Sequence, residues 1–229
     1  MKDGYIHITM VIDESGSMYS SKEDVKGGIK NLVEEQKKNK DGKVTLSLYT
    51  FNDKVDEVFV GKDINDFDDF EYDPTSMTAM NDGIGTAIDK TGKWLANMKE
   101  EDRPSKVLVA IFTDGLENSS KEYTLSQVKE MIAHQEKVYS WTFMYLGTDI
   151  TTTKMAEDLG IRTRTYSSRR SLSKNYDIIN CATSAYRNAV SAGATLDSAN
   201  DVFCATLTEA SLLNTNDYEK EIGKKIENE

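Results

Sequence analysis

The sequence contains little cysteine, proline or histidine. Its 229 residues include two residues of each type, with 14 glycines. Two cysteines cannot form a framework of disulfides or fill a structural zinc site. Scarce proline with ordinary glycine excludes a collagen-like or linker-rich chain. With 38% hydrophobic residues, a chain of this length suits one large domain or a domain with an appendage.

The two cysteines, Cys181 and Cys204, lie in helix-like stretches among apolar neighbours. Free cysteine is among the most buried residue types, so we expect two buried free thiols. A disulfide between the two helices is the alternative. Either way, the cysteine content does not indicate a disulfide-stabilised scaffold.

Long hydrophobic runs are also absent. No stretch approaches the roughly 18 apolar residues of a membrane-spanning helix. The first apolar run, residues 5–12, is short, ends at Asp13 and lacks the small-residue cleavage pattern of a signal peptide. We therefore expect a soluble protein of a reducing compartment, located in the cytoplasm.

Basic residues are outnumbered. The chain has 28 Lys and Arg against 39 Asp and Glu, a formal net charge of −11. Binding to phosphate backbones or to anionic lipid requires a basic surface. We therefore expect neither nucleic acid nor a membrane as a partner.

Apolar, β-branched runs alternate with segments of helical periodicity. Only Asn52-Asp53-Lys54 separates the second and third runs, which predicts an antiparallel hairpin. The alternation predicts an α/β fold in which a doubly wound, mainly parallel six-stranded sheet carries one antiparallel edge strand and helices on both faces. The predicted strands are residues 5–12, 44–51, 55–60, 106–113, 138–146 and 163–166.

Helical segments are expected between these strands and after the last of them. Thr124-Leu125-Ser126-Gln127 fits a capping box and predicts a helix start. The other helices are expected from about residue 25, over about 80–97 and around 154–159. After Tyr166 the pattern is helical, and we divide the chain into a main domain, residues 1–192, and a C-terminal helical extension with a charged tail, residues 193–229.

The most informative motif is Asp13-Glu14-Ser15-Gly16-Ser17, directly after the first apolar run. A strand that ends in Asp-x-Ser-x-Ser places one carboxylate and two hydroxyls on a single loop. Closely spaced oxygen ligands suit a hard divalent cation such as Mg²⁺. Asp and Ser also favour ordinary turns and helix N-caps, so this segment alone does not establish a metal site.

Two further oxygen donors stand at suitable places. Thr78 lies just before the second predicted helix, and Asp114 follows the most apolar strand, 106–113. In open α/β sheets, ligands bind beyond the carboxyl ends of the strands, where Asp13, Asp114 and Asp149 all lie. The candidate metal ligands are therefore Asp13, Ser15, Ser17, Thr78 and Asp114.

Three motifs in this order resemble the von Willebrand factor A (vWA) family. They are Asp-Glu-Ser-Gly-Ser after the first strand, a threonine before a helix bearing Asp82-Gly83-Ile84, and Thr113-Asp114-Gly115 after a later strand. In that family they form the metal-ion-dependent adhesion site, or MIDAS. The resemblance covers about residues 4–166, and Gly147-Thr148-Asp149 resembles a later loop of the family.

The resemblance implies a Rossmann-like sheet with Mg²⁺, or Mn²⁺ or Ca²⁺, at its top. It implies hydroxyl ligands from Ser15, Ser17 and Thr78, with Asp13 and Asp114 acting directly or through water. The family spacing favours Thr78, four residues before Asp82, over the alternative Thr75. We expect Asp82 to support the site rather than to bind the metal.

The expected function is metal-dependent binding of a protein partner that presents an Asp or Glu side chain to the ion. The absence of a signal peptide places the chain nearer the intracellular or viral type than the secreted adhesion proteins. One alternative is a structural subunit of a multi-protein or viral particle, in which the metal only stabilises loops. A less favoured alternative is an Mg²⁺-dependent phosphatase of the haloacid dehalogenase kind, with Asp13 as nucleophile. Such an enzyme needs a second carboxylate as general acid two residues after the nucleophile, and Ser15 occupies that position. We therefore expect no enzymatic activity.

Several other features favour ordinary structural roles. The acidic and aromatic run 63–73 is expected to be a solvated loop, and Glu14 a solvated carboxylate. We expect His7 and His134 to be core or surface residues without a catalytic role. An apolar rim around the metal, suited to protein binding, is expected from Met18, Tyr19, Met77 and Met80.

Overall fold

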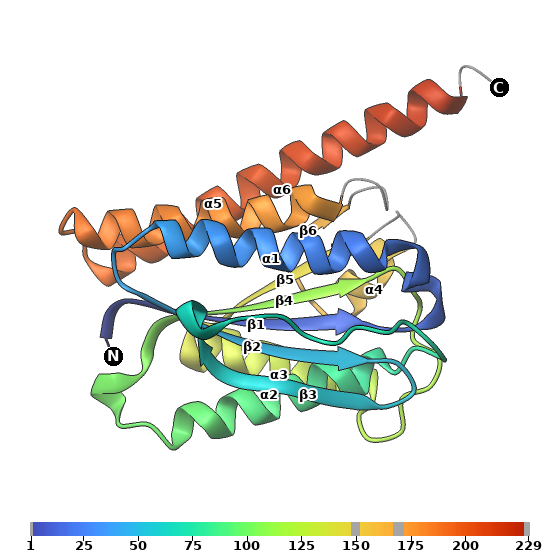
Figure 1. Ribbon diagram of the computed structural model, residues 1–229, viewed down its shortest axis with the longest axis horizontal. Helices are drawn as coiled ribbons and strands as arrows, with labels where there is room; N and C mark the ends of the chain where they lie inside the picture. The colour runs from blue at the N-terminus through green and yellow to red at the C-terminus, as the bar shows by residue number, and fades with distance from the viewer. Residues whose placement is uncertain (1, 148–151, 167–171, 227–229) are drawn as a thin grey trace.

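The computed structural model describes residues 2–147, 152–166 and 172–226 (Figure 1). Its centre is a six-stranded sheet with the strand order β3-β2-β1-β4-β5-β6. Five strands are parallel, and the edge strand β3 pairs antiparallel with β2. The predicted fold class is therefore confirmed. The strands are β1 (Lys2–Asp13), β2 (Lys43–Phe51), β3 (Val55–Asp63), β4 (Pro104–Thr113), β5 (Thr142–Gly147) and β6 (Thr163–Tyr166).

Helices cover both faces of the sheet (Figure 1). Helices α1, α5 and α6 lie over one face, and α2, α3 and α4 pack on the other. Two separate apolar clusters fill these layers, as expected of a doubly wound sheet. The helices are α1 (Lys22–Lys38), α2 (Met80–Ala96), α3 (Leu125–Tyr139), α4 (Thr152–Asp158), α5 (Leu172–Ser191) and α6 (Leu196–Ile226).

Strand β1 lies in the middle of the sheet, between β2 and β4, and both of its faces are buried. Ile6, Ile8 and Met10 pack into the cluster beneath α1 and α5. Alternate residues face the opposite helices, where Val11 packs into the second cluster. The residue pairing β1–β4 runs up to Ile12 and Phe112, so the loops after both strands emerge side by side at one edge.

The start of α3 agrees with the sequence, whereas its end does not. Thr124 and Gln127 form the predicted capping box. The predicted strand 138–146 begins only at Thr142, because α3 continues to Tyr139 and ends at Ser140, whose φ of 55° is left-handed. The β-branched and aromatic residues Val138 and Tyr139 therefore lie exposed on the last turn of a helix.

The prediction of buried cysteines is wrong. Cys181 and Cys204 are free, as predicted, but both are exposed. On α5 the buried positions include Ile179, Ala182 and Tyr186, which turns Cys181 outward. The i, i+3 and i+4 spacing of those residues defines the buried face of α5, and Cys181 lies outside it.

Helix α6 begins as part of the domain core and then leaves it. Ala199, Phe203 and Leu207 are buried in the same cluster as α1 and α5. The C-terminal half extends past the body of the protein (Figure 1), and Leu212 and Leu213 are exposed. A domain boundary at residues 192/193 stays a prediction. Within the described ranges no helix, even the 31-residue α6, combines the length and apolarity needed to cross a bilayer.

The acidic run 63–73 is not simply a solvated loop. Its carboxylates are mostly exposed, but Phe67, Phe70 and Tyr72 are buried in the cluster beneath α1. Lys26 forms an ion pair with Asp69 on its outer side, 3.3 Å apart. The aromatic residues anchor this segment across the edge of the sheet, and its end reaches the loop after β1.

Candidate metal centre

The loop after β1 is folded by its own side chains. Asp13 ends the strand, and its Oδ1 accepts a hydrogen bond of 2.8 Å from the backbone N–H of Ser15. Residues Gly16–Ser21 then form a 3₁₀ turn that leads into α1. This tight turn brings the hydroxyls of Ser15 and Ser17 to 3.0 Å from each other.

The end of β4 supplies the second carboxylate. Because β4 pairs with β1 in parallel, Asp114 emerges beside the Asp13 loop. Its Oδ1 accepts a hydrogen bond from the hydroxyl of Ser17. Asp13, Ser15, Ser17 and Asp114 thus form one connected group, although 97 residues separate Ser17 from Asp114.

Thr78 faces the same space from the loop before α2. A Cβ atom added to Gly115 would lie 3.2 Å from Thr78 Oγ1 and 3.4 Å from Asp13 Oδ2. The two oxygens therefore converge on space that only glycine leaves open at position 115. Thr78 is buried, whereas Thr75 is exposed and its backbone N–H donates to Glu14 O. The geometry favours Thr78 over Thr75, as the sequence did.

The donor set fits a small, hard divalent cation. Adjacent ligands in a Mg²⁺ octahedron lie about 3 Å apart, since Mg–O distances are about 2.1 Å. The hydroxyls of Ser15 and Ser17 match that spacing. In the part of the chain that the structure describes, no group of three or more His, Cys, Asp and Glu residues is placed to hold a metal ion. The candidate set differs from such a group in combining two carboxylates with three neutral hydroxyls.

Electrostatics also favour a cation at this edge. Burial raises the pKa of Asp13 to about 6, and the nearby charge of Asp114 adds to the rise. Hydrogen bonds from Ser15 and Thr113 act in the opposite direction but do not cancel it. A buried carboxylate beside a second one is costly to ionise, and a bound cation removes that cost.

The structure adds two supporting residues that the sequence did not identify. Thr113 Oγ1 donates to Asp13 Oδ2 at 2.6 Å, and the buried Tyr72 donates its hydroxyl to the backbone O of Asp13, also at 2.6 Å. Both hold Asp13 in place. Thr113 stands beside Asp114 in the motif and could have been suspected, whereas Tyr72 is 59 residues from its partner and carries no local signal.

A second group of residues holds the loop after β4. Asp82 accepts hydrogen bonds of 2.7–2.9 Å from the backbone N–H groups of residues 121, 122 and 123. The supporting role predicted for Asp82 fits these contacts. Asn118 bridges the loops through two bonds, accepting from Thr78 N and donating its own N–H to Thr78 O.

Two minor predictions at this edge need correction. Glu14 is half-buried rather than solvated, and its Oε1 accepts a hydrogen bond of 2.5 Å from Asp73 N. Met18 and Met80 belong to the core, so only Tyr19 and Met77 of the predicted rim are exposed. Asp149, the fourth loop position, lies outside the described residues.

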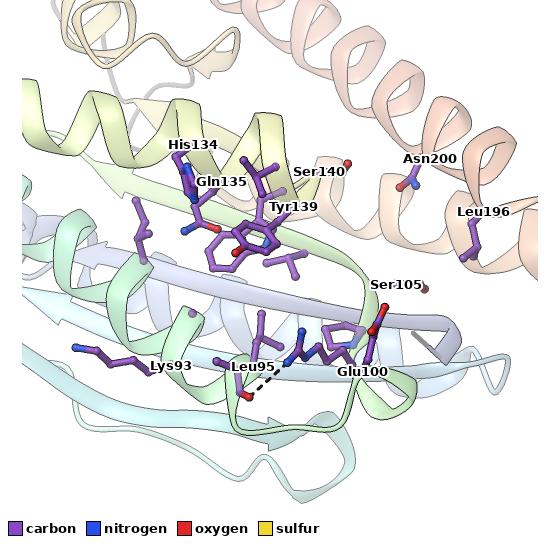
Figure 2. A pocket seen from close by; sticks show the side chains of 18 of the residues that line it. Lys93, Leu95, Glu100, Ser105, His134, Gln135, Tyr139, Ser140, Leu196 and Asn200 are labelled. Atoms are coloured by element: carbon purple, nitrogen blue, oxygen red, sulfur yellow. Dashed lines mark hydrogen bonds between the residues drawn. The ribbon is translucent and has the colours of Figure 1, made fainter.

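A cavity of about 830 Å³ lies at the opposite end of the sheet (Figure 2). Leu95 of α2 and Tyr139 of α3 line it on one side, and Leu196 and Asn200 of α6 lie across from them. None of the candidate metal ligands borders this cavity. The candidate metal ligands lie instead on convergent surface loops at the carboxyl end of the sheet. We call this end of the sheet the metal edge.

Comparisons with known proteins identify the family and the fold. The family model of the von Willebrand factor type A domain matches residues 7–173, which include all five candidate ligands. Among curated proteins, no sequence matches the chain significantly.

Solved structures share the fold at low sequence identity. Proximal thread matrix protein 1 from the mussel byssus, in a form with a zinc-occupied MIDAS motif, is similar with a TM-score of 0.55 and 19% identity, covering 79% of this chain and 46% of that one. The pilus adhesin SpaC from Lactobacillus rhamnosus GG is similar with a TM-score of 0.58 and 15% identity, covering 80% of this chain and 30% of that one. The chain thus spans less than half the length of either protein.

Proposed function

The chain belongs to the von Willebrand factor type A domain family, and from that premise we propose that it is a metal-dependent protein-binding module and not an enzyme. One observation carries the proposal. Three loops far apart in the sequence bring two carboxylates and three hydroxyls together at the carboxyl edge of the sheet. The proposed metal ligands are Asp13, Ser15, Ser17, Thr78 and Asp114.

The chemistry of this set explains how such a module binds. Two carboxylates balance a divalent charge, and neutral hydroxyls leave the ion able to accept a further anionic ligand. We propose Mg²⁺ as the resident ion, with Mn²⁺ and Ca²⁺ as alternatives. The outside ligand is an Asp or Glu side chain of a partner protein. A protein of charge −11 attracts it because the ion reverses the local sign.

The phosphatase alternative has less support. Phosphoryl transfer through Asp13 needs a general acid near the nucleophile. Ser15 stands at the expected position and cannot fill that role, and its hydroxyl lies against Ser17. A phosphatase screen with Mg²⁺ tests this, and activity that disappears in Asp13→Asn would overturn the proposal.

The main experiment compares metal-dependent capture in matched variants. The purified protein is immobilised, proteins from native lysate are captured with Mg²⁺ or with EDTA, and the captured proteins are identified by mass spectrometry. We expect Ser15→Ala and Asp114→Ala to abolish the Mg²⁺-dependent set with little change in melting temperature. Ser20→Ala is the control, because Ser20 is an exposed serine of the same turn.

The same experiment separates binding from a purely structural role of the metal. If the metal only fixes loops, EDTA will lower the melting temperature and leave capture intact. Titration of Mn²⁺ into the metal-free protein, followed by calorimetry, measures binding without any partner. Retained capture in Asp114→Ala would also contradict the proposal.

A further inference from the structure

We propose that an apolar rim on three loops borders the metal edge and selects a partner segment whose Asp or Glu is flanked by aliphatic or aromatic residues. This inference rests on the proposed function and deepens it. We define the apolar rim as Tyr19, Met77 and Leu116. Each of these residues lies on a different ligand-bearing loop.

The positions of the rim residues follow the ligands closely. Tyr19 comes two residues after Ser17, and Leu116 comes two residues after Asp114. Met77 directly precedes Thr78. The exposed fractions of Tyr19, Leu116 and Met77 are 70%, 55% and 51%, among the largest of any apolar side chains in the described part of the chain.

The loop stretches that carry the rim contain no charged residues, and charged residues at their borders are engaged with other groups: Lys22 pairs with Asp73 at 3.0 Å, and Glu117 accepts the backbone N–H of Asn81 at 2.8 Å. Residues 15–21, 74–81 and 115–116 contain no Asp, Glu, Lys or Arg, although these types make up 29% of the chain. Depletion of charge together with exposed Tyr and Met is typical of the centre of a protein–protein interface.

The rim is held in place before any partner arrives. Gly16 N donates to Ser76 O at 3.2 Å, which joins the first loop to the second, and Thr78 N donates to Asn118 Oδ1 at 2.9 Å, which joins the second to the third. Ser76 has a left-handed φ of 66°, and such strained positions persist where surrounding contacts fix them. Loops ordered in advance lower the entropy cost of binding.

The chemistry of the partner follows from these two features. The ion accepts one carboxylate, while the stretches that carry the rim, residues 15–21, 74–81 and 115–116, supply no charged side chain to pair with charged flanking residues. Burying a charge there without compensation is unfavourable, whereas apolar flanks remove the rim from water. The fitting partner is therefore an exposed protein segment with a single acidic residue between apolar ones.

A selection from random peptides tests this preference directly. A displayed peptide library with a fixed central Asp and randomised flanks is bound in Mg²⁺ and eluted with EDTA, beside a second library with a central Asn. We expect recovery only from the Asp library, with Leu, Ile, Phe, Tyr or Trp enriched beside the Asp.

The outcomes separate the two proposals. Recovery that depends on Mg²⁺ and Asp but shows random or charged flanks overturns the apolar rim and leaves the metal module standing. Equal recovery from the Asn library, or no elution by EDTA, overturns the proposed function itself.

Variants then locate the preference on the surface. An enriched peptide is measured by fluorescence anisotropy against Tyr19→Ser, Leu116→Ser and a matched control, Tyr139→Ser. Tyr139 has a similar exposed fraction, 59%, but lies beside the cavity at the other end of the sheet (Figure 2). We expect about tenfold weaker binding for the rim variants, unchanged binding for Tyr139→Ser and unchanged Mn²⁺ affinity in all three. Equal losses for Tyr19→Ser and Tyr139→Ser, or none for the rim variants, would contradict the inference.

Discussion

Strand β1 carries two buried polar clusters, of which one contains only neutral groups and the other contains carboxylates. In mid-strand, the buried His7 lies 2.8 Å from Thr45 Oγ1 and 3.1 Å from Ser47 Oγ, with Trp94 against its ring. At the end of the strand, the buried Asp13 lies in the group with Ser15, Ser17 and Asp114. In the first cluster, neutral hydroxyls serve as hydrogen-bond partners of both ring nitrogens of His7. The second cluster brings two carboxylates close together.

The directions of the pKa shifts express this difference. Burial lowers the pKa of His7 to about 3, so the ring is neutral at physiological pH and costs little to bury. Burial raises the pKa of Asp13 to about 6, yet this carboxyl is still largely ionised at pH 7 and costs stability. The cluster around His7 therefore stabilises the fold without a bound ion, whereas the cluster around Asp13 is suited to a cation.

The largest expected effect is the pH dependence that His7 imposes. Its folded pKa lies below its unfolded value of 6.5, so the unfolded chain binds more protons between pH 6.5 and 3. The contribution of His7 to stability is present above pH 6.5 and falls with pH in that window, by about 3 kcal/mol between pH 7 and 4. Asp13 acts in the opposite direction over part of this window, so the contribution is measured as the difference between the wild type and His7→Gln, by urea unfolding of both metal-free proteins at several pH values.

The control for this prediction uses the other histidine of the chain. His7→Gln should remove the contribution of His7, so that its stability relative to the wild type rises as pH falls through this window. His134→Gln, at an exposed histidine, is the matched control substitution. Parallel curves for the wild type and His7→Gln would show that the mid-strand cluster does not behave as described.

Asp13 should show the opposite sign. Its folded pKa is raised, so its contribution to stability is fully present below pH 3.8 and is lost as pH rises through about 6. In the metal-free protein at pH 7, Asp13→Asn should therefore increase the free energy of unfolding, by up to about 3 kcal/mol. Unfolding in urea with EDTA measures this gain.

The same variant should lose its response to metal. A ligand present at 100 times its Kd stabilises the wild type by about 2.7 kcal/mol, and Asp13→Asn should show almost none of that. Stabilisation without metal and loss of stabilisation with metal would together mark Asp13 as a site residue. A variant that is less stable in EDTA would break the comparison with His7.

Much of this arrangement was predictable because it depends on local patterns. Strand β4 is a continuous apolar run that must be buried on both faces, and the capping box fixes the start of α3. The candidate ligands could be predicted because the carboxyl ends of parallel strands lie at the same end of the sheet. Once β1 and β4 were identified as parallel strands, Asp13 and Asp114 were expected at that end.

Other features depend on contacts that leave no local pattern. The hydroxyl of Tyr72 reaches Asp13 across 59 residues, and only the folded segment 63–73 brings it there. The cysteines were misplaced because both helices allow more than one apolar face, and packing of α5 against α1 and of α6 against α5 selects one of them. Such choices are made by tertiary packing and not by periodicity.

The next prediction concerns how firmly the loop after β4 is held. Asp82 accepts three backbone N–H groups of that loop, and its carboxylate has no hydrogens that would oppose them. Asp82→Asn leaves one acceptor oxygen and introduces two donors, so we expect a loss of about 2 kcal/mol. Thermal unfolding measures it, with Asp89→Asn, on the outer side of α2 in an ion pair with Lys93, as the control. A loss confined to Asp89→Asn would contradict this role.

The smallest effect should come from Tyr72→Phe, which removes one hydroxyl and keeps the aromatic anchor. The lost hydrogen bond to Asp13 O is buried, so we expect a cost of about 1 kcal/mol. Because that bond positions the end of β1, Mn²⁺ affinity should fall by a few-fold as well, whereas Phe70→Leu should reduce stability through packing and leave the affinity unchanged. If Tyr72→Phe changes stability alone, the segment 63–73 supports only the fold. A change in both would connect the buried aromatic anchor, through one backbone oxygen, to the metal edge that distinguishes the end of β1 from its middle.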